Sequence, residues 1–114
     1  EETFSLGICN GCQMMSQLKD LIPGADHWPK FVRNLSEQFE ARLNMVEVLE
    51  SNSIFLNGME GSMIPIATSH GEGRVQYFHD GDMNTLIDSR SVTIRYVDNS
   101  GQPAIRYPDN PNGY

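Results

Sequence analysis

The sequence predicts an α/β fold with a mixed sheet, and three observations point to it. An apolar run of Phe4, Leu6 and Ile8 leads into a glycine-flanked Cys9 and then into a helix-forming stretch. Later segments alternate apolar and polar residues, as half-buried strands do, and turn residues separate them. The length of 114 residues suits one domain or part of one, and a 39% share of hydrophobic residues allows a modest core.

The first two elements are expected to be a short buried strand over Thr3–Ile8 and a helix over Asn10–Ile22. In the helix, apolar residues recur at i, i+4 and i+7, which is the spacing of one helix face. Pro23 and Gly24 follow directly, and this pair typically ends a helix.

A half-buried strand is expected to begin at Phe39, because apolar and polar residues alternate from there to Met45. Val46 and Val48 shift the phase of this alternation, and the shift predicts a bulge. Residues 25–35 are expected to form an irregular connection before this strand, and residues 53–56 a helical turn after it.

The second half of the chain is expected to contain short strands, one short helix and a hairpin. Asp82 belongs to the residue types that cap helices, so a helix is expected to begin there. The expected elements are strands over Ile64–Ser69 and Arg74–Phe78, a helix over Asp82–Arg90, hairpin strands over Val92–Val97 and Ala104–Tyr107, and a turn-rich loop over Pro108–Tyr114.

We expect residues 1–114 to be a partial domain, truncated at both ends. A cysteine turn of this kind lies at the carboxyl edge of a parallel sheet, and parallel neighbours require βαβ units. Here the strand before the turn opens the chain, and the chain stops in a loop. We expect the cysteine turn with its strand and helix in residues 1–22, strands and a polar turn in 37–78, and a short helix, hairpin and loop in 82–114.

Composition excludes several classes of partner. The net charge is -7 and the pI is about 4.7, whereas nonspecific nucleic-acid binding needs clustered Lys and Arg. The apolar runs are too short to cross a membrane, and the N-terminus does not resemble a signal peptide. Two cysteines three positions apart do not form a disulfide framework, so we expect a reducing, cytoplasmic setting.

The segment Gly7-Ile8-Cys9-Asn10-Gly11 is the strongest candidate for chemistry. It is the cysteine version of the G-x-S-x-G nucleophile elbow, a sharp turn from a strand into a helix. The helix N-terminus favours the thiolate, which is the reactive form of cysteine. Gly7 and Gly11 are expected to avoid collisions at the turn.

Cys9 has three interpretations. It can be a buried structural cysteine, half of a dithiol with Cys12, or a nucleophile that forms a thioester. A zinc site is the weakest option, because two cysteines supply only half of the ligands and His27, His70 and His79 lack a finger-like spacing.

A second polar cluster is Ser69-His70-Gly71-Glu72-Gly73, where a strand ends in a glycine-interrupted turn. Such a turn can hold an amino-acid head group through its backbone N–H groups. We interpret His70 as a structural residue. Gln13 lies one helical turn after Cys9, so its amide can reach a polar substrate beside the sulfur, although a solvated helix glutamine has the same sequence pattern.

These motifs carry a resemblance to a known family. GICNGCQ fits the Gly-x-Cys-x-Gly-x-Gln signature of class I (triad) glutamine amidotransferases, and SHGEGR fits their Ser-His-Gly turn. The resemblance implies a flavodoxin-like fold. Further stretches resemble the glutaminase domain of the phosphoribosylformylglycinamidine synthases (formylglycinamidine ribonucleotide amidotransferases) of the long single-chain type: LIPG, WPKFVRN, FEAR, GMEGSMIPIATSHGEGR, RYVDN and YPDNPNG.

The resemblance implies a role for each motif residue. Cys9 would attack the side-chain amide of glutamine and form a γ-glutamyl thioester, and the backbone N–H of Asn10 would stabilise the oxyanion. Ammonia would pass through a channel to a synthetase domain, where formylglycinamide ribonucleotide becomes the amidine with ATP and magnesium, in purine biosynthesis. No cofactor or metal is expected in this chain. The residues implied to hold glutamine are Gln13, Ser69, Gly71 and Glu72.

The same resemblance places the general base in a His-Pro-Glu motif after NPNG. The chain ends at Tyr114, so no residue here is given that role, and the 114-residue chain alone is expected to be inactive. Two other classes remain as alternatives, a CxxC dithiol redox module and a noncatalytic interaction fragment.

Overall fold

The computed structural model describes residues 3–113, so Tyr114, the last residue of the expected tail, lies outside the described residues. The elements in chain order are α1 (Asn10–Gln17), the 3-10 turn η1 (Lys19–Leu21), β1 (Lys30–Val32), β2 (Glu40–Val48), β3 (Met63–His70), β4 (Arg74–Gln76), α2 (Asp82–Asp88) and β5 (Ile94–Val97). The α/β class is therefore confirmed.

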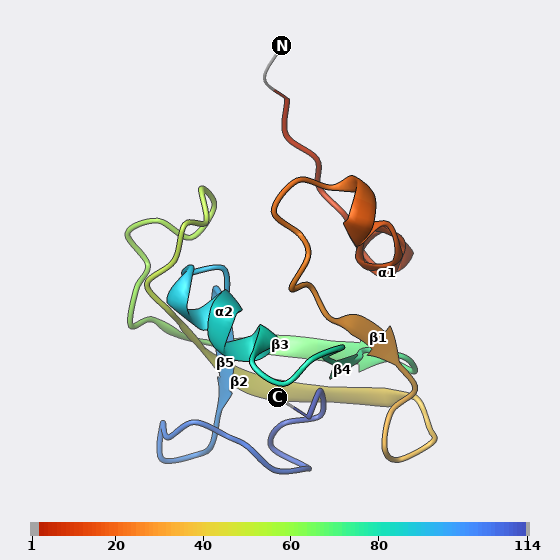
Figure 1. Ribbon diagram of the computed structural model, residues 1–114. Coiled ribbons are helices and arrows are strands. Elements are labelled where there is room, and N and C mark those ends of the chain that lie inside the picture. The colour runs from red at the N-terminus through yellow and green to blue at the C-terminus, as the bar shows by residue number, and fades with distance from the viewer. Residues whose placement is uncertain (1–2, 114) are drawn as a thin grey trace.

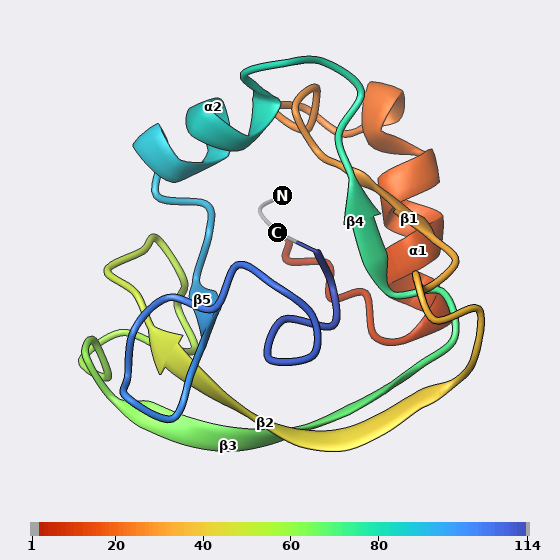
Figure 2. The ribbon, with the colours of Figure 1, turned by 90° about the horizontal axis from the view of Figure 1, so that it is seen from below.

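The strands of residues 3–113 form two antiparallel sheets and no mixed sheet, because the segment before Cys9, which was expected to supply a strand, pairs with none of them. One has the order β3-β2-β5 and the other pairs β1 with β4. The long β2–β3 ladder runs from Glu40 opposite His70 to Glu47 opposite Met63. Figure 2 shows the elements arranged as a ring, with the C-terminal loop, residues 103–113, curling inside the curve of β2 and β3. In Figure 1, α1 and α2 lie on the same side of the long hairpin.

The buried face of β2 is the opposite of the expected one. The expectation placed the alternating residues from Phe39 to Met45 toward the core, but Phe39 is 64% and Leu43 77% exposed. Glu40, Asn44 and the two valines of β2 are buried instead. These buried residues share one face without a phase shift, and the β2–β3 register is continuous, so the expected bulge is wrong.

Proline at position 65 fits its place at the edge of the sheet. Val48 follows the Glu47–Met63 pair and donates its N–H to the Ser62 carbonyl, so its backbone groups face β3. Because hydrogen-bonded pairs alternate along an antiparallel ladder, the Met45–Pro65 pair is a non-hydrogen-bonded one. Pro65 therefore costs no bond to β2, and its missing N–H faces the open side of β3.

The interior of the described chain is more polar than apolar. Only five hydrophobic residues are buried, against seven polar or charged ones. Every buried side-chain nitrogen and oxygen among residues 3–113 has a hydrogen-bond partner. A buried polar group without a partner would cost about 1–3 kcal/mol, so these bonds are a condition of the fold. The buried polar residues are Ser16, Asn34, Glu40, Asn44, Thr68, Asp82 and Asn110.

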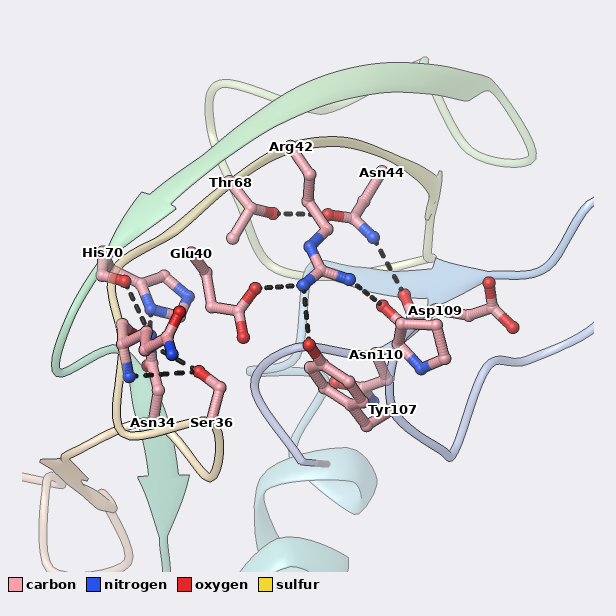
Figure 3. A network of polar contacts seen from close by, with 12 residues as sticks. Asn34, Ser36, Glu40, Arg42, Asn44, Thr68, His70, Tyr107, Asp109 and Asn110 are labelled. Carbon is pink, nitrogen blue, oxygen red and sulfur yellow. Dashed lines mark hydrogen bonds and ion pairs between the residues drawn. The ribbon is translucent and has the colours of Figure 1, made fainter.

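The polar face of β2 holds the C-terminal loop (Figure 3). Arg42 pairs with Glu40 and donates to the Tyr107 hydroxyl at 3.0 Å and the Pro108 carbonyl at 3.2 Å. One position further along this face, the amide of Asn44 donates to the Asp109 carbonyl at 3.1 Å. The loop is thus fixed to β2 by hydrogen bonds that span more than 60 residues of sequence.

Three further differences from the sequence expectations concern the N-terminal half. Residues 3–8 pair with no strand of residues 3–113, and Phe4, Leu6 and Ile8 are 87%, 69% and 72% exposed, so the buried strand expected there is wrong for the described chain. A strand forms only where a neighbour accepts its backbone bonds. The expected first helix divides into α1 and η1, and β1 lies within the expected irregular connection.

The second half differs less. The expected strands over 64–69 and 74–78 are confirmed as β3 and β4. The N-cap of α2 is Gly81, and Asp82 instead lies buried in the first turn, where it accepts from the His79 N–H at 3.0 Å and contacts His27 at 3.2 Å. Burial opposes the charge of Asp82, but the contact with His27 and the His79 N–H hold its pKa below the ordinary value.

The expected hairpin after β5 is reduced to a single bridge. Val97 pairs with Pro103, and Ala104 donates its N–H to the Tyr96 carbonyl. Proline has no N–H and cannot continue the ladder. Among the described helices, none is long and apolar enough to cross a lipid bilayer.

We expect Glu40→Gln to lower the stability of the chain at pH 7. Hydrogen bonding to Ser36 and the nearby Arg42 guanidinium hold the pKa of Glu40 below its ordinary 4.5, against the effect of burial. A lowered pKa contributes stability above pH 4.5 that is lost as the pH falls through the folded-state value. Thermal denaturation between pH 7 and pH 3 should show a lower Tm for the variant at pH 7 and convergence with the wild type in acid.

Glu50→Gln is the matched control, because Glu50 forms an ion pair with Arg90 in which both side chains are largely exposed. Such pairs contribute about 0–1 kcal/mol, so its Tm should change little. Equal effects of both substitutions would contradict the special role of Glu40.

Candidate functional site

Cys9 occupies a sharp turn at the start of α1. Its φ of 55° and ψ of -122° lie outside the regions that a cysteine ordinarily adopts, and it is the N-cap of the helix. The turn is held by two short-range bonds, from the Gly11 N–H to the Ile8 carbonyl at 2.9 Å and from the Cys12 N–H to the Cys9 carbonyl at 3.0 Å. The strained, exposed cysteine is what a nucleophile elbow requires.

The two glycines around Cys9 differ in what they do. A Cβ atom on Gly7 would lie 2.9 Å from the Gly11 carbonyl oxygen and 3.0 Å from the Cys12 nitrogen, both backbone atoms. A Cβ atom on Gly11 would meet nothing within 4 Å among the described residues outside its own helix backbone. The expected steric role is confirmed for Gly7 and wrong for Gly11.

The elbow and the Ser69–Gly73 turn lie around one cavity of about 540 Å³. A direct bond links them, because the Gln13 side-chain amide donates to the Glu72 carbonyl at 3.0 Å across 59 positions of sequence. The structure therefore brings together all six residues to which the motifs assign a role: Cys9, Asn10, Gln13, Ser69, Gly71 and Glu72. The cavity is lined by Cys9, Asn10, Cys12, Gln13, Phe31, Phe39, Ser69, His70, Gly71, Glu72 and Gly73.

Backbone groups supply much of the polarity of this cavity. Asn10 is the first residue of α1, and the first N–H groups of a helix have no carbonyl partner within the helix. Its N–H is therefore available beside the sulfur. The Cys9 thiol lies 3.9 Å from the Asn10 side-chain oxygen, a weak contact that leaves the sulfur accessible.

Cys12 lies one helical turn from the elbow and lines the same cavity as Cys9. Partial burial of its thiol raises the pKa of Cys12 above the ordinary value of 9.0. Both cysteines are free.

Within residues 3–113, no three His, Cys, Asp or Glu side chains lie close enough to hold a metal ion. His27 contacts Asp82 instead, and His70 lies between Asn34 and Asn112.

Sequence reasoning missed the asparagines that support the site. Asn34 is 3% exposed and donates its backbone N–H to the Gly71 carbonyl at 2.9 Å, and Asn112 contacts the ring of His70. Neither has a local pattern that marks it as functional. The available signal was their position inside WPKFVRN and YPDNPNG, two of the stretches that carry the family resemblance.

An exposed cysteine on a strained turn, beside a second turn rich in backbone donors, is an arrangement that thiol-dependent acyl-transfer enzymes use. A more specific assignment comes from comparison with protein families. The model of the CobB/CobQ-like glutamine amidotransferase domain matches residues 1–114. The chain belongs to this glutamine amidotransferase family, and the resemblance is confirmed at that level.

We expect Gly7→Ala and Gly11→Ala to have different effects on stability. The methyl group at Gly7 would press on two backbone atoms, and such overpacking costs about 1–3 kcal/mol. At Gly11 it meets open space in a helix, where alanine is better than glycine by about 0.5–1 kcal/mol. Urea denaturation of both variants checks the difference, and a Gly11→Ala loss as large as that of Gly7→Ala would contradict it.

Proposed function

We propose that this domain is a glutaminase in which Cys9 is the nucleophile, and that it supplies ammonia to an ATP-dependent ligase. The observation that carries the proposal is the single cavity shared by Cys9, the Asn10 N–H and the Ser69–Gly73 turn. The family supports the reaction class, because a glutamine amidotransferase releases ammonia from glutamine.

The chemistry begins at the sulfur of Cys9. The thiolate attacks the side-chain carbonyl of glutamine, a carbon–sulfur bond forms, the carbon–nitrogen bond breaks, and ammonia leaves after taking up a proton. Water then cleaves the thioester and returns glutamate and the thiol. In this proposal the Asn10 N–H, at the positive end of α1, stabilises the negative oxygen of each tetrahedral intermediate.

Glutamine binding is assigned to the opposite wall of the cavity. The Ser69 hydroxyl and the backbone of Gly71 and Glu72 lie there, and the Glu72 carboxylate is exposed to take the α-ammonium group. Gln13 connects this wall to α1 through its bond to the Glu72 carbonyl. Its side-chain oxygen remains available as an acceptor for the substrate.

The finer assignment is the glutaminase of a phosphoribosylformylglycinamidine synthase that acts in the cytoplasm. It is supported by the stretches of resemblance, from LIPG to YPDNPNG, that extend over most of the chain. In this proposal the synthetase part of the protein binds ATP and magnesium and receives ammonia through a channel. The proton-transferring histidine belongs to the His-Pro-Glu motif that the resemblance places after NPNG.

Labelling with a diazoketone analogue of glutamine tests the nucleophile. In the full-length protein that carries this domain, mass spectrometry should show one adduct on Cys9, and excess glutamine should protect it. Cys12→Ser is the matched control, because Cys12 lines the same cavity but is not the proposed nucleophile, and this variant should be labelled on Cys9 like the wild type. Labelling of both cysteines without protection would favour the dithiol alternative, and an unlabelled protein a noncatalytic role.

Substituting Cys9 with alanine tests the link to a ligase. Glutamine-dependent synthesis of the amidine should fall by about 10³-fold or more, since a nucleophile is lost. Synthesis with added ammonium chloride should remain within about twofold of the wild type, because ammonia bypasses the thioester. Steady-state assays with each nitrogen source make the comparison, and equal loss of both activities would show that Cys9 is not the glutaminase nucleophile.

A further inference from the structure

His70 lies at the end of β3, with both ring nitrogens in hydrogen bonds. Its Nδ1 is 2.8 Å from the side-chain oxygen of Asn34, and its Nε2 is 2.7 Å from that of Asn112. The first partner precedes β2 and the second belongs to the C-terminal loop, so the ring joins segments 78 positions apart in sequence (112 minus 34). A ring held on both sides is not free to move protons for a substrate.

The orientation of the Asn34 side-chain amide determines which of its atoms meets Nδ1 of the His70 ring. Its side-chain nitrogen donates to two carbonyls, those of Gln38 at 2.9 Å and His70 at 2.7 Å. The oxygen of this amide must therefore face the ring, and Nδ1 of His70 carries the hydrogen. Nε2 of the neutral ring is then an acceptor, so the Asn112 amide meets it through its nitrogen, with the oxygen and nitrogen of that amide exchanged. Asn34 also donates its N–H to the Gly71 carbonyl, so this buried residue holds His70 and the next residue together.

Asn112 is fixed by its own backbone. Its N–H donates to the side-chain oxygen of Asn110 at 3.0 Å, and its carbonyl accepts from the Val75 N–H at 3.1 Å. The loop is thus tied to β4 directly after the turn, while Asn110 is itself buried and bonded to the Ala104 carbonyl. The far side of the His70 ring therefore rests on a well-supported residue.

The His70 ring also packs against the turn that follows it in the sequence. A Cβ atom on Gly73 would lie 2.4 Å from the carbon atoms of the His70 ring, so the imidazole lies directly against the backbone of Gly73. Gly71 and Glu72 lie between His70 and Gly73 in the sequence. Both residues line the cavity that Cys9 also lines.

We propose that His70 is a positioning residue that holds the backbone of Gly71 and Glu72 at the separation from Cys9 that glutamine requires. The inference rests on the proposed glutaminase function. Asn34 and Asn112 orient the imidazole, and the imidazole supports the turn. In this arrangement His70 controls substrate binding, and it takes no part in the attack of the thiolate.

The test is His70→Ala in the full-length protein, with glutaminase kinetics and thiol labelling as separate measurements. Because the turn loses the ring that supports it, KM for glutamine should rise about 10- to 100-fold, with kcat within about threefold. The rate of Cys9 alkylation by iodoacetamide, which needs no glutamine site, should stay unchanged. His79→Ala, an exposed histidine outside the cavity, is the matched control and should retain the wild-type KM.

An unchanged KM in folded His70→Ala would overturn the proposal, and so would a loss confined to kcat, which would indicate a role in proton transfer. If His70→Ala does not fold, Asn112→Ala is tested instead. This substitution removes one hydrogen-bond partner of the His70 ring, and Asn112 lies in a loop and is only half-buried. It should raise KM in the same direction by a smaller factor, and an unchanged KM would contradict the proposal. A wild-type protein without Cys9-dependent glutamine hydrolysis would instead refute the proposed function itself.

Discussion

The hydrogen-bonding requirement of the inner face of β2 is the constraint on which the rest of the structure depends. Glu40 pairs with Arg42 on this face. Arg42 and Asn44 in turn donate to the Tyr107 hydroxyl and to the carbonyls at 108 and 109. These bonds place the C-terminal loop, and the loop in turn places Asn112 against His70. The geometry of the Ser69–Gly73 turn is therefore linked to a polar core that lies under the sheet.

The sequence predicted the local features of the site better than the long-range ones. The elbow around Cys9 and the Ser69–Gly73 turn follow from short motifs whose backbone requirements are visible in neighbouring residues. The prediction of which face of β2 is buried was wrong for two reasons. The hydrogen-bond partners of the buried face lie more than 60 positions away in the sequence, and reading burial from alternating apolar residues assumes an apolar core. The three-residue β1 was missed because it depends on its pairing with β4, which no local pattern reports.

The strain at Cys9 is maintained by its surroundings. A residue with φ of 55° that is not glycine costs of order 1–3 kcal/mol and persists only when neighbouring contacts enforce it. The bonds from the Gly11 and Cys12 N–H groups on one side and the close approach of Gly7 on the other supply that enforcement. Composition alone does not predict a strained backbone at Cys9. The glycine at position 7 does indicate that backbone atoms approach closely at this turn.

The position of Pro65 has a consequence for self-association. Exposed strand edges recruit further strands from other molecules and so promote aggregation. On one side of the three-stranded sheet, β3 presents an edge that lacks a donor at residue 65. On the other side, β5 is covered by the returning chain through the bond from Ala104 to Tyr96. The sheet is thus protected at both margins against growth into fibrils, even though its outer face carries the exposed Leu43.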